Sequence, residues 1–195
     1  MTKYILAGGC DLQYPEYLSQ LARIIRTDFE QPKILSCWFS ISDDEAEAKF
    51  SDYKEYFLNF FNEKTEFIKA TKDEFLDQVE NANVIYFHGG HTTLLLPAME
   101  RYGEMREVFR GKIVVGSSAG ANYISKFGFS PSKATVGKGT GLVNVSTIVH
   151  FGSRGFNDMT FKPSYWQDAI KKVKEESGSN EVVLLPEGTF TVIDV

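Results

Sequence analysis

Hydrophobic positions along the chain alternate between short apolar runs and longer segments of helical period. The apolar runs, each typical of a buried strand, lie at residues 4–7, 33–39, 66–69, 83–87 and 112–115. Between them, apolar side chains recur every three or four positions, as on one face of a helix: Leu18, Leu21, Ala22 and Ile25; Ala46, Phe50, Tyr53 and Phe57; Phe75, Leu76 and Val79; Leu94, Leu95, Ala98 and Met99. Strands buried on both faces read as continuous apolar runs. The pattern therefore predicts an α/β fold, a three-layer α/β/α sandwich with a mostly parallel central sheet.

Local signals place several element ends. Three predicted helices open with capping boxes, in which a hydroxyl and a side chain three residues later satisfy free amides: Ser42 with Glu45, Thr71 with Glu74, and Ser164 with Gln167. Residues 127–155 are rich in Gly, Ser and Thr and break the alternation, with short strands expected at 142–145 and 147–150. Two final apolar runs, 182–185 and 190–193, flank Pro186-Glu187-Gly188 and predict a C-terminal hairpin. No repeat or linker divides the chain, so we expect one domain over residues 1–195.

Composition narrows the class of protein. Of the 195 residues, 43% are hydrophobic, which excludes a disordered chain, and the net charge of −5 is opposite to that of most nucleic-acid-binding proteins. No apolar run approaches the roughly 20 residues of a membrane span. Cys10 and Cys37 are too few for a disulfide scaffold, and the apolar stretch before Cys10 is too short for a signal peptide. We expect a cytoplasmic protein with neither nucleic acid nor membrane as partner.

The strongest chemical signal is a G-x-S-x-G motif, Gly116-Ser117-Ser118-Ala119-Gly120, between an apolar run and a predicted helix. A strand that turns sharply into a helix raises the central hydroxyl above the sheet, and small neighbours avoid collisions. Ser118 is thus a candidate nucleophile, and the Ala119 amide at the helix N-terminus is a candidate oxyanion donor. A tightly packed turn and an anion-binding turn are the alternatives. No G-x-G-x-x-G or P-loop pattern supports the second of these.

A serine nucleophile needs a general base, and the chain has three histidines. His150 ends an apolar run after Ser118, where either a base or a simple polar cap would lie. His88 and His91 flank Gly89-Gly90, and a glycine amide approaches a ligand closely, so Gly90 is a candidate second oxyanion donor. The two histidines have no third ligand nearby in the sequence, so we expect no metal site.

Together these pieces resemble the dipeptidase E and cyanophycinase family of serine peptidases. The matching segments are Gly89-Gly90-His91-Thr92, Gly116 to Asn122, Gly141-Leu142-Val143-Asn144 with His150-Phe151, and Leu185-Pro186-Glu187-Gly188. The resemblance covers most of the chain apart from residues 153–163. It implies a fold related to class I glutamine amidotransferases, with Ser118 as nucleophile, His150 as base and an oxyanion hole from the amides of Gly90 and Ala119. It also implies small peptide substrates with an N-terminal aspartate and no cofactor.

The residue that orients His150 is left open by the sequence. The family usually places an acid between serine and histidine, but residues 108–157 contain no Asp or Glu. The candidates are Asn144, by analogy with papain-like sites, and Asp158 or Asp168 after the histidine. Because no acid lies between Ser118 and His150, a second function remains an alternative: a non-catalytic relative that binds a small acidic peptide or metabolite. An esterase of the α/β-hydrolase type is disfavoured, because that fold orders its triad as serine, acid, histidine.

The same segment, 108–157, carries a formal charge of +6 from Arg110, Lys112, Lys126, Lys133, Lys138 and Arg154. Positive charge around a cleft attracts anionic substrates, although such residues also serve simply as a solvated surface. Arg154, four residues after His150, is the candidate for binding a substrate carboxylate, because a guanidinium binds it bidentately. The sequence does not distinguish a monomer from a homodimer.

Overall fold

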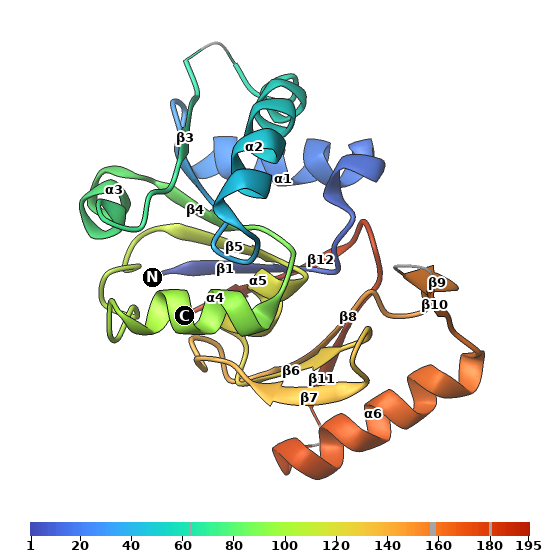
Figure 1. Ribbon diagram of the computed structural model, residues 1–195. Helices are drawn as coiled ribbons and strands as arrows, with labels where there is room; N and C mark the ends of the chain where they lie inside the picture. Colours follow the sequence, from blue (N-terminus) through green and yellow to red (C-terminus); the bar gives the residue numbers. More distant parts are fainter. Residues whose placement is uncertain (63, 157–158, 180) are drawn as a thin grey trace.

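A computed structural model describes residues 1–62, 64–156, 159–179 and 181–195. Its centre is a six-stranded sheet with the order β12-β1-β5-β4-β2-β3 (Figure 1). The members are β1 (Lys3–Ala7), β2 (Lys33–Cys37), β3 (Glu66–Lys69), β4 (Val84–Phe87), β5 (Ile113–Ser117) and β12 (Phe190–Asp194). All neighbours run parallel except β12, which is antiparallel to β1. The predicted mostly parallel sheet is confirmed.

Helices cover both faces of this sheet. On one face, α1 (Pro15–Asp28) and α2 (Asp43–Leu58) pack on alternate strand residues such as Ile5 and Ala7. On the other face, the residues between them, such as Leu6, contact α3 (Phe75–Asn81), α4 (Thr92–Glu100) and α5 (Ala119–Ile124). The three-layer sandwich is therefore confirmed. No helix within the described ranges combines the length and the hydropathy of a membrane span.

A second, four-stranded sheet, with the order β11-β8-β6-β7, lies beside the first and is covered by α6 (Pro163–Ser177) (Figure 1). Its strands are β6 (Phe127–Ser130), β7 (Thr135–Lys138), β8 (Ser146–Val149) and β11 (Val182–Leu185). Between β8 and α6 lie the short strands β9 (Gly155–Phe156) and β10 (Met159–Thr160), which pair with each other. Most of this sheet comes from the Gly-, Ser- and Thr-rich segment. Of the two strands expected there, the later one corresponds to β8, whereas residues 142–145 form no strand.

The predicted C-terminal hairpin is wrong. β11 pairs in parallel with β8 in the small sheet, whereas β12 pairs antiparallel with β1 in the large one. Each strand completes the open edge of a different sheet, which gives both a partner without pairing them together. The intervening turn, which includes Glu187, therefore crosses from one sheet to the other. It lies beside the ends of β1 and β8, because the Gly188 amide donates to the Gly9 carbonyl and the Phe151 amide donates to the Leu185 carbonyl.

In one of the three predicted capping boxes, the hydroxyl makes the expected hydrogen bond: Ser42 Oγ accepts from the Glu45 amide at 3.3 Å. The other two are wrong. The third helix has Glu74 rather than Thr71 at its N-cap position, and α6 begins at Pro163, with Lys162 as its N-cap. Proline fixes a helical φ and suits the first helical position, so the helix starts one residue before Ser164.

Candidate active site

Ser118 lies on the sharp turn from β5 into α5. Its backbone, at φ 49° and ψ −105°, is outside the regions that L residues usually adopt, a strain of roughly 1–3 kcal/mol that the surrounding structure must offset. The neighbouring glycines are required by packing. A Cβ on Gly116 would lie 2.5 Å from the Gly120 carbonyl, and one on Gly120 would lie 2.3 Å from the carbonyl oxygen of Phe87. Small residues therefore allow the turn that exposes the hydroxyl.

His150 follows β8 and brings its ring to this hydroxyl. Its Nε2 lies 2.9 Å from Ser118 Oγ, and the residue is only 3% exposed. The His150 amide donates to the Gly8 carbonyl at 3.0 Å, which ties the end of the small sheet to the end of β1. A Cβ at Gly9 would lie 2.5 Å from His150 Cε1, so glycine there leaves the space that the ring occupies.

The other ring nitrogen of His150 contacts Glu187, with 2.9 Å between Nδ1 and Oε1. A carboxylate only accepts, so the hydrogen bond places the ring proton on Nδ1. In a neutral ring, Nε2 is then the acceptor for the Ser118 hydroxyl. Burial lowers the pKa of His150 below 6.5, an effect that the bond to Glu187 and its charge partly oppose. The ring is therefore neutral at pH 7 and able to accept a proton.

Glu187 is the site residue that the sequence analysis missed. Glu187 belongs to one of the segments that resemble the family. The sequence placed it in the turn of a predicted hairpin, and such a hairpin does not bring it near His150. Of the residues named instead, Asn144 is exposed in a loop, Asp168 is exposed on α6, and Asp158 lies outside the described residues. In the sequence, Glu187 is recognisable as an acidic residue in the turn after an apolar strand. That feature indicates a partner for His150 only once β11 is known to pair with β8, the strand before His150.

The two predicted oxyanion donors lie beside Ser118. Gly90 and Ala119 both line a cavity of about 140 Å³ that Ser118 and His150 also line. Within the described part of the chain, neither amide donates to a backbone carbonyl. At φ 142°, and with Ser40 O only 2.6 Å from where a Cβ would be, position 90 admits only glycine. Both N–H groups are thus available to a ligand at Ser118.

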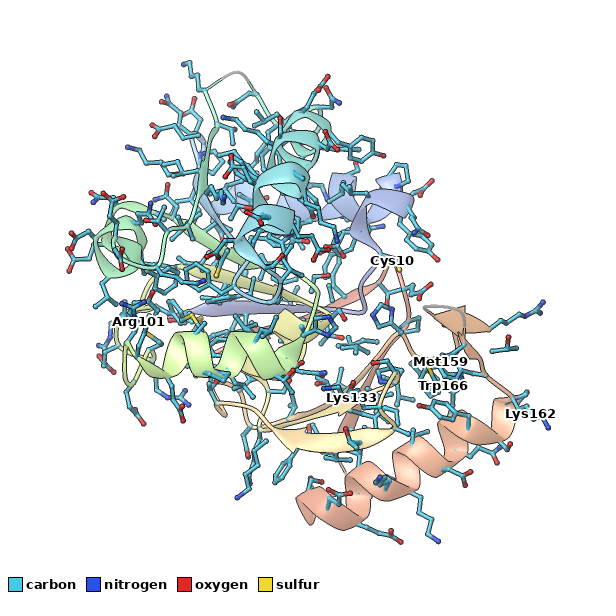
Figure 2. The ribbon with its side chains drawn as sticks, viewed as in Figure 1. Cys10, Arg101, Lys133, Met159, Lys162 and Trp166 are labelled. Atoms are coloured by element: carbon cyan, nitrogen blue, oxygen red, sulfur yellow. The ribbon has the colours of Figure 1, made fainter. Side chains whose placement is uncertain are left out.

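This first cavity, called here the basic cavity, is also lined by Lys133 and Lys138 from the β6–β7 hairpin. Lys133 is labelled in Figure 2. Its described lining does not include Arg154, which is exposed. Arg110 instead pairs with Glu107, and Lys112 donates to backbone carbonyls. The basic segment therefore reaches the site through two lysines rather than through the predicted arginine.

Ser118 and His150 also line a second cavity, of about 510 Å³. We call it the acidic cavity, because its lining includes Asp11, Glu45 and Asp52 against the single cation Lys49 among the described residues. Cys10 lines it as well and is labelled in Figure 2. The candidate nucleophile and base thus line two cavities whose charged residues have opposite sign.

A buried polar network lies beneath the acidic cavity. The Asp11 carboxylate accepts hydrogen bonds from Tyr86 at 2.6 Å, Ser117 at 2.8 Å and Tyr53 at 3.3 Å. Burial raises the pKa of Asp11, while these bonds partly offset the cost of burying its charge. Since Ser117 precedes the candidate nucleophile, the network holds the strained turn against the strands beside it.

His88 belongs to the core rather than to a metal pair with His91. Its ring stacks on Trp38 with 3.7 Å between centroids, and Nε2 lies 2.7 Å from Ser36 Oγ. Burial holds the pKa of His88 well below 6.5. The folded protein therefore keeps this ring neutral where the unfolded chain would protonate it.

Acid should destabilise the fold through His88. Below pH 6.5 the unfolded state binds the extra proton, so each unit of falling pH removes about 1.4 kcal/mol of unfolding free energy until the folded pKa is reached. His88→Gln lacks this acid-dependent loss of stability. The difference in unfolding free energy between native protein and His88→Gln should therefore shrink as the pH falls from 6.5 to 5. Urea titrations at several pH values measure it. His91→Gln, at an exposed position, is the control, and a constant native–His88→Gln difference would contradict the prediction.

Comparison with known proteins places the chain in a family. Residues 5–194 match the family described as Peptidase family S51. Among solved structures, the chain is similar to a peptidase from an acI-B1 Actinobacterium, with a TM-score of 0.70 and 19% identity, over 99% of this chain and 83% of that one. At this identity the likeness concerns the fold. No curated protein matches the chain significantly. Because the family match spans nearly the whole sequence, the chain belongs to peptidase family S51, the dipeptidase E and cyanophycinase family that its motifs predict, and is a serine-type peptidase.

Proposed function

We propose that this peptidase hydrolyses small peptides with an N-terminal aspartate, using Ser118, His150 and Glu187 as a catalytic triad. The observation that carries the proposal is the continuous chain of hydrogen bonds from the Glu187 carboxylate through the imidazole to the Ser118 hydroxyl, with both steps at 2.9 Å. The arrangement has the roles of a serine-protease triad, in which an acid orients the base. It ends at a cavity large enough for a small side chain.

In the proposed reaction, Ser118 Oγ attacks the carbonyl carbon of the scissile bond while His150 Nε2 takes the hydroxyl proton. Glu187 stabilises the imidazolium, and the amides of Gly90 and Ala119 bind the oxyanion of the tetrahedral intermediate. His150 then gives its proton to the leaving amine, and the C–N bond breaks. Water, deprotonated by the same imidazole, hydrolyses the acyl-enzyme and restores the serine.

The charge of the basic cavity supports an acidic first residue. Lys133 and Lys138 place two ammonium groups around a space of about 140 Å³, which suits a short side chain that ends in a carboxylate. The non-catalytic alternative was motivated by the lack of an acid before His150. Glu187 supplies an acid after it, so that motive no longer applies.

A fluorophosphonate probe and a dipeptide panel test the proposal together. We expect the probe to label native protein at Ser118, and the protein to cleave Asp-Leu much faster than Asn-Leu, which has the same shape without the charge. Protein that binds Asp-Leu but neither cleaves it nor reacts with the probe would overturn the proposal.

The lysines should act on substrate binding rather than on chemistry. Exposed ion pairs contribute up to about 1 kcal/mol each, so Lys133→Gln with Lys138→Gln should lower kcat/KM for Asp-Leu about 10-fold, mainly through KM. Hydrolysis of Asn-Leu should change little. Lys126→Gln is the matched control, because Lys126 is exposed and belongs to the same basic segment, but is not among the described residues of the cavity lining. Equal losses on both dipeptides would contradict the assignment.

A further inference from the structure

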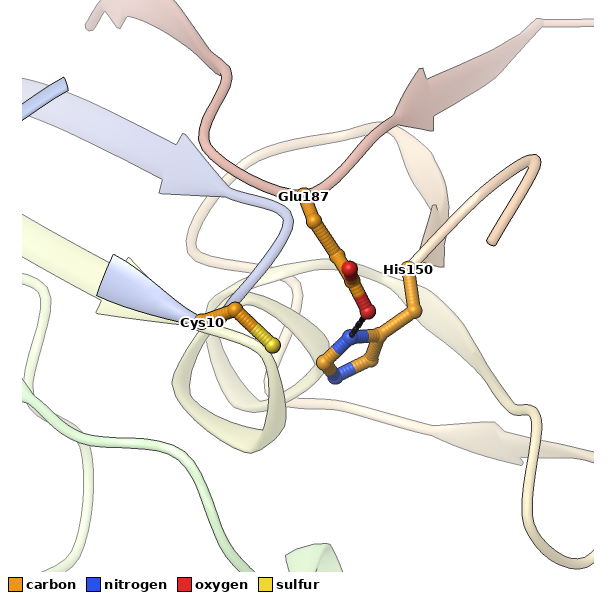
Figure 3. Close-up of side chains that lie close together, drawn as sticks. All are labelled: Cys10, His150 and Glu187. Carbon is orange, nitrogen blue, oxygen red and sulfur yellow. Dashed lines mark hydrogen bonds and ion pairs between the residues drawn. The ribbon is translucent and has the colours of Figure 1, made fainter. Parts of the chain in front are cut away.

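Three potential metal ligands converge beside the candidate nucleophile. The Cys10 sulfur, a ring nitrogen of His150 and a Glu187 carboxylate oxygen all lie within 4.8 Å of one another. Figure 3 shows the Cys10 side chain directed toward the imidazole from the segment after β1, with Glu187 on the turn above the ring. The left-handed backbone of Cys10, at φ 61°, holds the thiol in this place. The proposed triad uses His150 and Glu187 but has no role for Cys10.

We propose that Cys10, His150 and Glu187 form an inhibitory site for a thiophilic divalent cation, Zn²⁺. Thiolate, imidazole and carboxylate are the three ligand types of protein zinc sites, whereas Mg²⁺ and Ca²⁺ prefer oxygen alone. Bonds of about 2.0–2.3 Å in tetrahedral geometry set the ligand atoms about 3.3–3.8 Å apart. The three atoms already lie within 4.8 Å, so small side-chain movements complete the geometry.

The surroundings give the ion access and a fourth ligand. Cys10 and His150 line the acidic cavity, and Glu187 is 18% exposed, so an ion enters from solvent and keeps one water. The Asp11 carboxylate lies close enough to influence the thiol and adds attraction for a cation. On binding, Cys10 releases its thiol proton to solvent and a sulfur–zinc bond forms, with no change of oxidation state.

Occupancy would remove the general base. If zinc binds Nδ1, it displaces the bond to Glu187 and leaves the ring proton on Nε2, which then donates to Ser118 instead of accepting from it. If zinc binds Nε2, it occupies the lone pair that catalysis needs.

Cobalt binding tests the site independently of activity. Co²⁺ added to the metal-free full chain should give a thiolate-to-cobalt charge-transfer band at one equivalent, and Zn²⁺ should remove it. Cys10→Ser should lack the band, whereas Cys37→Ala, which changes the other, buried cysteine, should retain it. Glu187→Gln should keep the band with weaker affinity. No band in native protein, or a native-like band in Cys10→Ser, would overturn the proposal.

Inhibition is the second readout, and it rests on the proposed function. Zn²⁺ should slow fluorophosphonate labelling of native protein, and Cys10→Ser should need about 100-fold more zinc for the same relative effect, since even outer-shell changes cost 10–100-fold in metal affinity. Each variant is compared with its own zinc-free rate. Native protein that shows the cobalt band but labels at the same rate with zinc would refute the inhibitory role. Native protein that never labels, while the band appears, would refute the triad and leave the metal site standing.

Discussion

Ser118→Ala is expected to lower kcat for Asp-Leu by about 10⁶-fold, because removing a serine nucleophile costs about as much as removing its whole triad. The variant should still bind the dipeptide, since the two lysines of the basic cavity and the oxyanion amides remain. Steady-state kinetics measure the first effect, and calorimetric titration of Asp-Leu measures the second. Fluorophosphonate labelling should also disappear.

The neighbouring hydroxyl provides a control for this variant. Ser117 Oγ donates to the buried Asp11 carboxylate rather than facing the imidazole. Ser117→Ala should therefore act mainly on stability, with a loss of about 1–3 kcal/mol for the hydrogen bond that Asp11 no longer receives. Chemical labelling should persist. If Ser117→Ala abolished labelling while Ser118→Ala kept it, the assignment of the nucleophile would be wrong.

Glu187→Gln is expected to lower kcat about 10⁴-fold, the cost of replacing the triad acid with its amide in a serine protease. An amide can donate to Nδ1, which allows the ring proton to move to Nε2 and leaves Ser118 without an acceptor. Asp168→Asn is the matched control, since Asp168 is exposed on α6 and should leave kcat at the native value. Similar losses in both variants would contradict the assignment of Glu187.

The pH profile separates the role of Glu187 from a merely structural one. Because burial lowers the pKa of His150, native kcat/KM should stay high below pH 6.5 and fall only as pH drops through that lowered value. Glu187 acts in the opposite direction and raises the pKa of His150. The acid limb of the residual activity in Glu187→Gln should therefore move to lower pH. A limb that stays in place or moves to higher pH would show that Glu187 does not contact the working base.

The three proposed triad residues come from different parts of the architecture, which makes the site sensitive to how the two sheets pack. Ser118 follows a strand of the large sheet, His150 follows a strand of the small one, and Glu187 lies on the turn that links them. The hydrogen bond from the His150 amide to Gly8 joins the two ends directly. A change at Gly9 would push on the ring from this junction, because a Cβ there lies within 3 Å of both Cε1 and Nε2.

By itself, the sequence determined the features whose causes are local. The alternation of apolar runs with helical stripes predicted the parallel sheet and its two helix layers, and glycines around Ser118 predicted the strained turn, because each depends on residues close together in the chain. His150, Gly90 and Ala119 were named as candidates in the same way, the first two from their places after predicted strands and Ala119 from its place at a predicted helix N-terminus. The family resemblance then assigned roles to them.

Tertiary structure alone decided which distant segments meet. Apolar runs predict that two strands exist near the C-terminus but not that each pairs at the edge of a different sheet, because edge partners are chosen by packing between elements far apart in sequence. That choice removed the expected hairpin and carried Glu187 to His150. It likewise decided that Lys133 and Lys138, rather than Arg154, line the cavity beside Ser118, since the direction of an exposed side chain follows from the path of its hairpin and not from its distance along the chain.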